Sequence, residues 1–236
     1  MSDNTLLEIR DIHTFIGQFH ILEGVSVAVP EGGITVLLGR NGAGKTTTLR
    51  SIMGLNPATE GDIHFAGQSI RNHRAYKIGQ MGIGYVPEDR AIFKTLTVRE
   101  NLELAERESG DLKKRIGFIY DLFPDLERLY HLYGGQLSGG QQQMLAMARA
   151  LVPENRLLLI DEPSEGLAPI IIEQLMAAIK RLSSETTVLL VEQNFIMASQ
   201  LAESYVVLEE GQSVRAGDMQ ELRDNPDLVR KYLGVA

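Results

Sequence analysis

The chain has 236 residues, of which 44% are hydrophobic and 23% charged, and its formal net charge is −8. This length favours one sizeable α/β domain, or one domain with a smaller inserted subdomain, over two complete domains. The negative charge argues weakly against nucleic-acid binding, and no segment approaches the ~20 apolar residues of a membrane span. The absence of cysteine excludes disulfides, thiolate nucleophiles and cysteine metal sites.

The first residues, MSDNTLLEIRD, contain acids and lack a basic start followed by an apolar core. We therefore expect no secretory signal and a cytoplasmic location. Short alternating runs, LLEIRDI and VSVAV, are separated by turn residues around Gly17 and Gly24 and predict a small sheet. The next run, ITVLLG, is short, apolar and β-branched, and it predicts a buried strand that stops at Gly39.

A glycine-rich loop follows this strand directly. Gly39, Gly44, Lys45 and Thr46 match the phosphate-binding pattern G-x-x-x-x-G-K-[ST], and a helix is predicted to follow. Glycines allow successive backbone N–H groups to converge on a phosphate, and the helix N-terminus adds positive partial charge. We expect Lys45 to reach the β- and γ-phosphates and the Thr46 hydroxyl to bind Mg²⁺. The loop residues expected to contact the nucleotide are Gly39, Arg40, Asn41, Gly42, Ala43, Gly44, Lys45, Thr46 and Thr47.

The pattern becomes helical from Glu88 to about Tyr133. The segment LTVRENLELAERE has Thr97 and Glu100 in capping-box spacing, and DLKKRIGFIYDLF has apolar residues at helical intervals. We predict an inserted helical subdomain over residues 88–152, which includes the helix SGGQQQMLAMARALV. The core domain is then formed by residues 1–87 and 153–236.

A second buried strand with an acidic end is predicted at NRLLLIDEP. We expect Asp161 to hold Mg²⁺ and the neighbouring Glu162 to accept a proton from an attacking water. A helix, IIIEQLMAAIKRL, and the strands TTVLLVEQN and YVVLEEG follow, and Asn225 with Pro226 opens a last predicted helix. This alternation favours a mainly parallel sheet with helices on both faces.

The order of these motifs resembles that of ATP-binding-cassette ATPases over nearly the whole chain. The decisive addition is LSGGQ, Leu137 to Gln141, between the helical insert and LLLIDEP. By itself, Ser138 with Gln141 is a capping box at a helix start, which is also a good anion receptor. The resemblance implies an α/β fold: a P-loop NTPase core of the RecA-like type with an N-terminal antiparallel β subdomain and an inserted α-helical subdomain.

The resemblance also implies a head-to-tail dimer that closes on ATP. The signature residues of one subunit would contact the γ-phosphate held by Lys45 of the other, and SEGLAP, Ser164 to Pro169, would cross the interface. The signature residues expected to contact ATP are Ser138, Gly139, Gly140 and Gln141. The cofactors implied are ATP and Mg²⁺.

Three positions depart from the common family pattern. Glu88 in YVPEDR replaces a glutamine and offers an oxygen to Mg²⁺ or water. Gln193 in LLVEQN replaces a histidine near the γ-phosphate; it can hydrogen-bond to phosphate or water but cannot act as an acid or base. Ile16 replaces the aromatic residue that stacks on adenine, so the base contact falls to Ile16, or to Phe15 if the backbone shifts.

The chain is similar to the second ATPase subunit of branched-chain amino-acid type importers in four features: Glu88, Gln193, SEGLAP and the terminal KYLG. Such subunits lie on the inner face of the cell membrane. Their partners are permease subunits, an identical or different second ATPase subunit and, indirectly, a periplasmic or extracellular substrate-binding protein, with no nucleic acid. The stretch around Glu88 to Thr97 would dock the permease, with Ile92 and Phe93 either in that socket or packing the subdomain. Urea or amide uptake, lipid export and a soluble non-transport ATPase remain alternatives.

Overall fold

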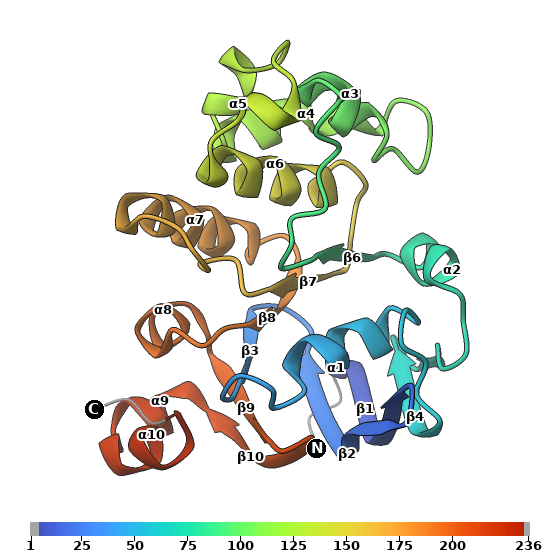
Figure 1. The fold of residues 1–236 in the computed structure, drawn as a ribbon, viewed down its shortest axis with the longest axis vertical. Coiled ribbons are helices and arrows are strands. Elements are labelled where there is room, and N and C mark those ends of the chain that lie inside the picture. Colours follow the sequence, from blue (N-terminus) through green and yellow to red (C-terminus); the bar gives the residue numbers. More distant parts are fainter. Residues whose placement is uncertain (1–4, 234–236) are drawn as a thin grey trace.

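The computed structural model describes residues 5–233, so Met1 to Asn4 and the glycine of the KYLG motif lie outside the described residues. At its centre is a six-stranded sheet in the order β10-β9-β3-β8-β7-β6 (Figure 1). The strands are β3 Ile34–Leu38, β6 Ile83–Val86, β7 Leu157–Asp161, β8 Thr187–Val191, β9 Ser204–Glu209 and β10 Gln212–Asp218. All of them run parallel except β10, which pairs with β9 in the antiparallel sense. The predicted, mainly parallel sheet is therefore confirmed.

The two faces of this sheet support two separate apolar cores. In β3, Val36 and Leu38 pack into a core with three helices, whereas Leu37 packs into a second core with one helix and the N-terminal strands. The three helices are α6 (Gly139–Leu151), α7 (Pro169–Leu182) and α8 (Phe195–Leu201), and the one is α1 (Lys45–Ile52). Every residue of β3, β7 and β8 is buried. Continuous apolar runs are typical of parallel strands that are covered on both faces.

A four-stranded antiparallel sheet, in the order β2-β1-β4-β5, lies against the second core. Its strands are β1 Thr5–Ile16, β2 Phe19–Pro30, β4 Glu60–Phe65 and β5 Gln68–Ser69. The expected break at Gly24 is wrong, because Gly24 lies inside β2 as an extra residue between the pairs Ile12–Val25 and His13–Glu23. Its φ of 103° is accessible to glycine without the Cβ penalty, so one long strand can continue through the bulge.

The described helices are α1 Lys45–Ile52, α2 Ala75–Gln80, α3 Val98–Glu103, α4 Asp111–Leu122, α5 Asp125–Arg128, α6 Gly139–Leu151, α7 Pro169–Leu182, α8 Phe195–Leu201, α9 Met219–Arg223 and α10 Pro226–Leu233. A 3₁₀ turn covers Gly134–Gln136. The apolar face predicted for the last helix is confirmed: Val229 of α10 is buried, and Leu228, Tyr232 and Leu233 pack against the first core. Within residues 5–233, no helix combines the length and apolarity that a membrane crossing requires.

The middle of the chain is helical, as predicted. Helices α3 to α6 lie between β6 and β7 and form the separate layer at the top of Figure 1. The capping box of α3 is present: the Thr97 hydroxyl accepts a hydrogen bond from the Glu100 N–H, and the Glu100 carboxylate accepts one from the Thr97 N–H. The subdomain boundaries at 87/88 and 152/153 remain a prediction.

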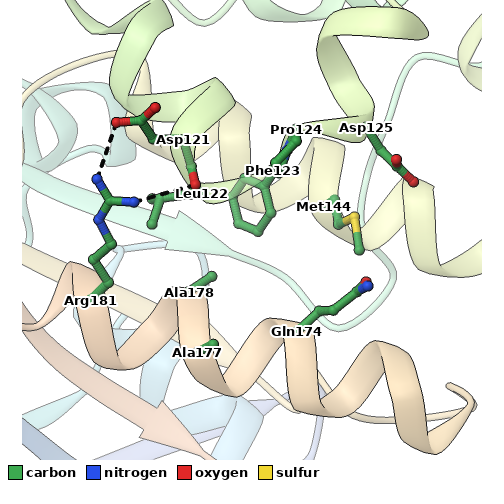
Figure 2. A pocket seen from close by; sticks show the side chains of 10 residues that line it. All are labelled: Asp121, Leu122, Phe123, Pro124, Asp125, Met144, Gln174, Ala177, Ala178 and Arg181. Atoms are coloured by element: carbon green, nitrogen blue, oxygen red, sulfur yellow. Dashed lines mark hydrogen bonds and ion pairs between the residues drawn. The ribbon is translucent and has the colours of Figure 1, made fainter.

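A cavity of about 360 Å³ separates the α4–α5 turn from α7 (Figure 2). On one side of it, Arg181 of α7 donates hydrogen bonds to the Asp121 carboxylate at 3.1 Å and to the Asp121 carbonyl at 3.3 Å. Phe123 and Met144 contribute apolar walls from the helical layer. A cavity therefore lies between the helical layer and α7, and the ion pair between Arg181 and Asp121 connects the two at the edge of this cavity.

Candidate functional site

The glycine-rich loop connects β3 to α1 and surrounds a buried lysine. The side chain of Lys45 is 4% exposed, and its ammonium donates to the carbonyl oxygens of Gly39 at 2.9 Å and Arg40 at 3.1 Å. Gly39 has a φ of 153°, and a Cβ there would lie 2.4 Å from the carbonyl oxygen of Leu208. Glycine is required at this position because the loop passes so close to β9.

The loop opens into a cavity of about 470 Å³. This volume lies within the range of small-molecule sites. Its lining comes from the β1–β2 hairpin, the loop, the start of α1 and the ends of β6, β7 and β8. The lining residues are Ile16, Ile21, Asn41, Gly42, Gly44, Lys45, Thr46, Thr47, Glu88, Glu162, Glu165 and Gln193.

Three predicted catalytic residues meet in this cavity. One oxygen of the Glu162 carboxylate lies 3.2 Å from the Lys45 ammonium, and the other accepts a 2.6 Å hydrogen bond from the Gln193 amide. Glu162 has a φ of 43°, a left-handed conformation that costs a non-glycine residue of order 1–3 kcal/mol. This backbone kink directly after β7 aims the carboxylate at the loop.

Asp161 lies beneath this group and is fully buried. Its carboxylate accepts hydrogen bonds from the Thr46 hydroxyl at 3.1 Å and the Tyr85 phenol at 3.2 Å. Burial raises the pKa of Asp161 to about 6, against the opposing effect of these two hydrogen bonds. A hydroxyl and a carboxylate that converge at 3.1 Å are hard oxygen donors of the kind that Mg²⁺ selects, so these residues fit that ion.

Glu88 and Ile16 complete the set that lines the cavity. Partial burial and the hydrogen-bonded carboxyl of Glu165 raise the pKa of Glu88. Ile16, at the end of β1, lines the cavity directly. Its neighbour Phe15 instead stacks on His20 with ring centroids 4.2 Å apart, which places it away from the lining.

The signature residues lie elsewhere in this chain. Ser138 caps α6, where its hydroxyl accepts a hydrogen bond from the Gln141 N–H at 3.3 Å and its own N–H donates to the Gln141 side chain at 3.0 Å. The predicted capping box is confirmed. Ser138, Gly139, Gly140 and Gln141, all of them described residues, are absent from the cavity lining. The fold therefore assembles the loop, the acids and Gln193 within one chain but keeps the signature apart.

Ile21 and Glu165 line the cavity although they were not predicted to do so, and two further residues at this site were also not predicted from the sequence. Tyr85, on the unpredicted strand β6, bonds to Asp161. Glu192 is 1% exposed and accepts backbone hydrogen bonds from Ser164, Gln193 and Asn194. An acid at the end of the apolar run TTVLLV is a signal that could have identified Glu192. The phenol of Tyr85 has no comparable signal, because strand pairing alone brings it to Asp161.

Comparisons with known proteins identify the family. A protein-family model described as ABC transporter matches residues 22–165. The high-affinity branched-chain amino acid transport ATP-binding protein BraG of Pseudomonas aeruginosa is 40% identical over 97% of this chain and 100% of its own length. The probable branched-chain amino acid transport ATP-binding protein LivF of Archaeoglobus fulgidus is 34% identical over 92% of this chain and 94% of its own length. A probable sulfate/thiosulfate import ATP-binding protein CysA of Chlorella vulgaris is 36% identical over 96% of this chain.

Solved structures agree with the fold. The ADP conformation of MJ1267, an ATP-binding cassette of an ABC transporter, superposes with a TM-score of 0.85 at 26% identity and covers 98% of this chain and 99% of that one. The dimeric, post-hydrolysis state of the cassette MJ0796 bound to ADP and Pi superposes with a TM-score of 0.80 at 25% identity over 90% of this chain. The expected P-loop NTPase core with antiparallel β and helical additions is thereby confirmed. This chain belongs to the ABC transporter family and is a nucleotide-binding ATPase cassette.

Proposed function

We propose that this chain is the ATP-hydrolysing subunit that powers a membrane importer of branched-chain or related amino acids. The observation that carries the catalytic part is the contact of Lys45 and Gln193 with the two oxygens of Glu162 in one cavity. The cargo rests on the two relatives whose names specify branched-chain amino acid transport. The importer would use permease subunits as partners and lie at the inner face of the membrane.

The loop and its lysine would bind the triphosphate. Backbone N–H groups of the glycine loop and the N-terminus of α1 favour negative charge at one place. Lys45, which now contacts Glu162 at 3.2 Å, would turn to the β- and γ-phosphates when they bind. That turn would release one carboxylate oxygen of Glu162 to face the attacking water.

Glu162 would then take a proton from that water as general base. Gln193 cannot titrate, so its amide would hold the carboxylate and contact the γ-phosphate by hydrogen bonds only. Thr46, Asp161 and Glu88 are the residues that would hold Mg²⁺. When bound, the ion would neutralise charge on the phosphate oxygens.

The signature would act in trans. Ser138 to Gln141 lie at the start of a capped helix, where backbone N–H groups favour an anion, yet they are outside the cavity of their own chain. A second ATPase subunit, identical or different, would supply these residues to the γ-phosphate. ATP would therefore hold two cassettes together, and hydrolysis would release them.

A groove next to the catalytic cavity is the proposed socket for the permease. It has a volume of about 400 Å³ and is lined by Thr46, Arg50, Leu55, Tyr85, Pro87, Glu88, Asp89, Ala91 and Asp161. Leu55 in this lining and Phe93 outside it are both 47% exposed, whereas Ile92 packs against the first core. A permease segment seated here would lie next to Glu88 and Asp161, the proposed metal ligands.

The test compares ATP turnover and oligomeric state of the wild type and Glu162→Gln, with and without Mg²⁺. We expect the variant to lose at least ~100-fold in kcat, since general-base catalysis contributes 10²–10⁴-fold, and to accumulate as an ATP-bound dimer. The matched control is Glu173→Gln, an exposed acid on α7, which should hydrolyse ATP normally. Turnover that survives in Glu162→Gln would contradict the assigned base.

The Glu162→Gln variant also tests which substrate is transported, in cells that express the chain with its permease. We expect Glu162→Gln to abolish uptake of labelled leucine, isoleucine and valine and to leave sulfate uptake unchanged. Loss of sulfate uptake with normal leucine uptake would instead contradict the amino-acid assignment.

A further inference from the structure

Glu192 is a buried carboxylate to which the mechanism above assigns no role. It follows β8 directly, is 1% exposed, and its side chain accepts hydrogen bonds from three backbone N–H groups. One oxygen takes the Ser164 N–H at 3.2 Å, and the other takes the N–H groups of Gln193 and Asn194 at 3.1 Å each. The carboxylate therefore joins the loop after β7 to the loop after β8.

The negative charge of Glu192 is stabilised by the dipoles of the backbone N–H groups that contact it. Among the described residues, no Lys, Arg or His lies within ion-pair distance of it, and the groups that contact it are hydrogen-bond donors. Burial raises the pKa of Glu192, whereas the hydrogen bonds from Ser164 and Asn194 oppose that rise. A buried acid without a cation is unfavourable for stability unless its hydrogen bonds are complete.

The two loops that Glu192 joins carry the catalytic pair. Glu162 lies two residues before Ser164, and the Gln193 side chain donates to the Glu162 carboxylate at 2.6 Å. The chain thus forms a closed ring: Glu192 holds the backbone of Gln193, Gln193 holds Glu162, and the strained turn after Glu162 returns through Ser164 to Glu192. A carboxylate is the only side chain that could accept from both loops here without presenting a donor to them.

We propose that Glu192 is a positioning residue that fixes Gln193 against Glu162 and sets the geometry of the turn carrying Glu162. This inference rests on the proposed ATPase mechanism, because its effect on turnover passes through Glu162. Glu192 contacts neither nucleotide nor water in this role. Its replacement should therefore change kcat far more than nucleotide affinity.

The test uses Glu192→Gln in the full chain. Glutamine keeps the shape but turns one acceptor into a donor that faces backbone N–H groups, which removes at least one of the three hydrogen bonds. We expect kcat to fall about 10- to 100-fold, as small misplacements of catalytic groups do, while the Kd for a fluorescent ATP analogue stays within about twofold. An unchanged kcat, or a loss that appears in Kd alone, would overturn the inference.

A structural control separates positioning from simple stabilisation. Glu203→Gln also changes an acid that accepts a backbone hydrogen bond, from the Ile34 N–H at 2.6 Å, but at the opposite end of β3. We expect that variant to keep wild-type kcat even where it lowers the melting temperature. A loss of kcat that merely follows melting temperature in both variants would mean that Glu192 has only a structural role.

A double-mutant cycle supplies the readout specific to the ring. If Glu192 acts through Gln193, the kcat of Glu192→Gln/Gln193→Ala should be no lower than that of the worse single variant, whereas fully additive losses would contradict the ring. If Glu192→Gln does not fold, Glu192→Asp replaces it in the same cycle with the same two outcomes. Glu162→Gln is measured alongside. If Glu162→Gln is inactive and Glu192→Gln has normal turnover, only the inference about Glu192 fails. If Glu162→Gln is active, the assignment of Glu162 as the base fails.

Discussion

At the residue scale, the site contains a carboxylate that the nucleotide-free protein stabilises poorly. Asp161 is fully buried among apolar strands, and two hydrogen bonds do not offset the loss of water, so burial raises its pKa to about 6. The same burial leaves the carboxylate oxygens unscreened and ready for a cation. The charged form of Asp161 thus lowers folding stability at a position that is a proposed metal ligand.

This conflict predicts that Asp161→Asn stabilises the nucleotide-free protein. A raised pKa means that the folded state holds the proton more tightly than the unfolded state, so stability is greatest below the unfolded pKa and falls as the pH rises towards about 6. The variant lacks this loss. Its advantage in the free energy of unfolding should grow by about 1 kcal/mol between pH 5 and pH 8 in EDTA.

Urea denaturation at both pH values measures this difference. A gap that is independent of pH would show that Asp161 titrates in the folded protein as it does in the unfolded chain. Adding Mg²⁺ and ATP should favour the wild type, because the charged carboxylate of Asp161 is the proposed metal ligand and the variant lacks it.

At the element scale, α3 and α6 begin with the same device but have different proposed roles. Each starts with a capping box, Thr97 with Glu100 and Ser138 with Gln141. Both pairs are recognisable from sequence because the motif is local and spans four residues. The second helix also carries the proposed contact with a partner's ATP, which the cap alone does not require.

Thr97→Ala and Ser138→Ala therefore form a matched pair. Each should lower the free energy of unfolding by about 1 kcal/mol, the usual value for losing an N-cap side chain. We expect only Ser138→Ala to lower ATP turnover as well, and the exposed Thr95→Ala to change neither quantity. Equal turnover in Thr97→Ala and Ser138→Ala would leave Ser138 with a capping role alone.

At the scale of the whole molecule, the signature residues lie outside the cavity, so in the proposed mechanism one chain does not complete its own site. Figure 1 shows α6 in the helical layer and the loop before α1 on the other side of the central sheet. Beside Arg181 and Asp121, the cavity of Figure 2 lies between the helical layer and α7. A partner copy placed head to tail would supply the missing signature.

Mixing two inactive variants tests this arrangement. Lys45→Ala removes the loop lysine and Ser138→Arg blocks the signature, so a mixed dimer keeps one intact composite site. Random pairing at equal amounts should restore up to roughly a quarter of wild-type turnover, since half of the dimers then carry one working site of two. If mixing restores nothing while Ser138→Arg, whose loop is intact, still binds ATP, the two identical chains do not form the composite site.

Much of this molecule was predictable because its signals are local or periodic. The buried strands at ITVLL, LLLID and TVLLV, the helical middle and the glycine loop all follow from runs or spacings within about a dozen residues. The elements that were not predicted are the strands β4, β5, β6 and β10 and the helices α2, α8 and α9. Strand β6 is only Ile83–Val86 and α2 only Ala75–Gln80, and both are too short for a clear period. In β10, exposed residues alternate with half-buried ones and none is buried, so the strand has no apolar face to recognise.

The sequence by itself determined which residues are chemically able to hold phosphate and a metal and to activate water, because Lys45, Thr46, Asp161 and Glu162 lie in motifs with a fixed local form. Only the tertiary structure decided how they meet. Strand order brings the ends of β3, β7 and β8 together, so Gln193 reaches Glu162, Tyr85 reaches Asp161, and Glu192 joins two loops that are 28 residues apart in the chain. Such contacts depend on sheet register and burial, which no short stretch of sequence encodes.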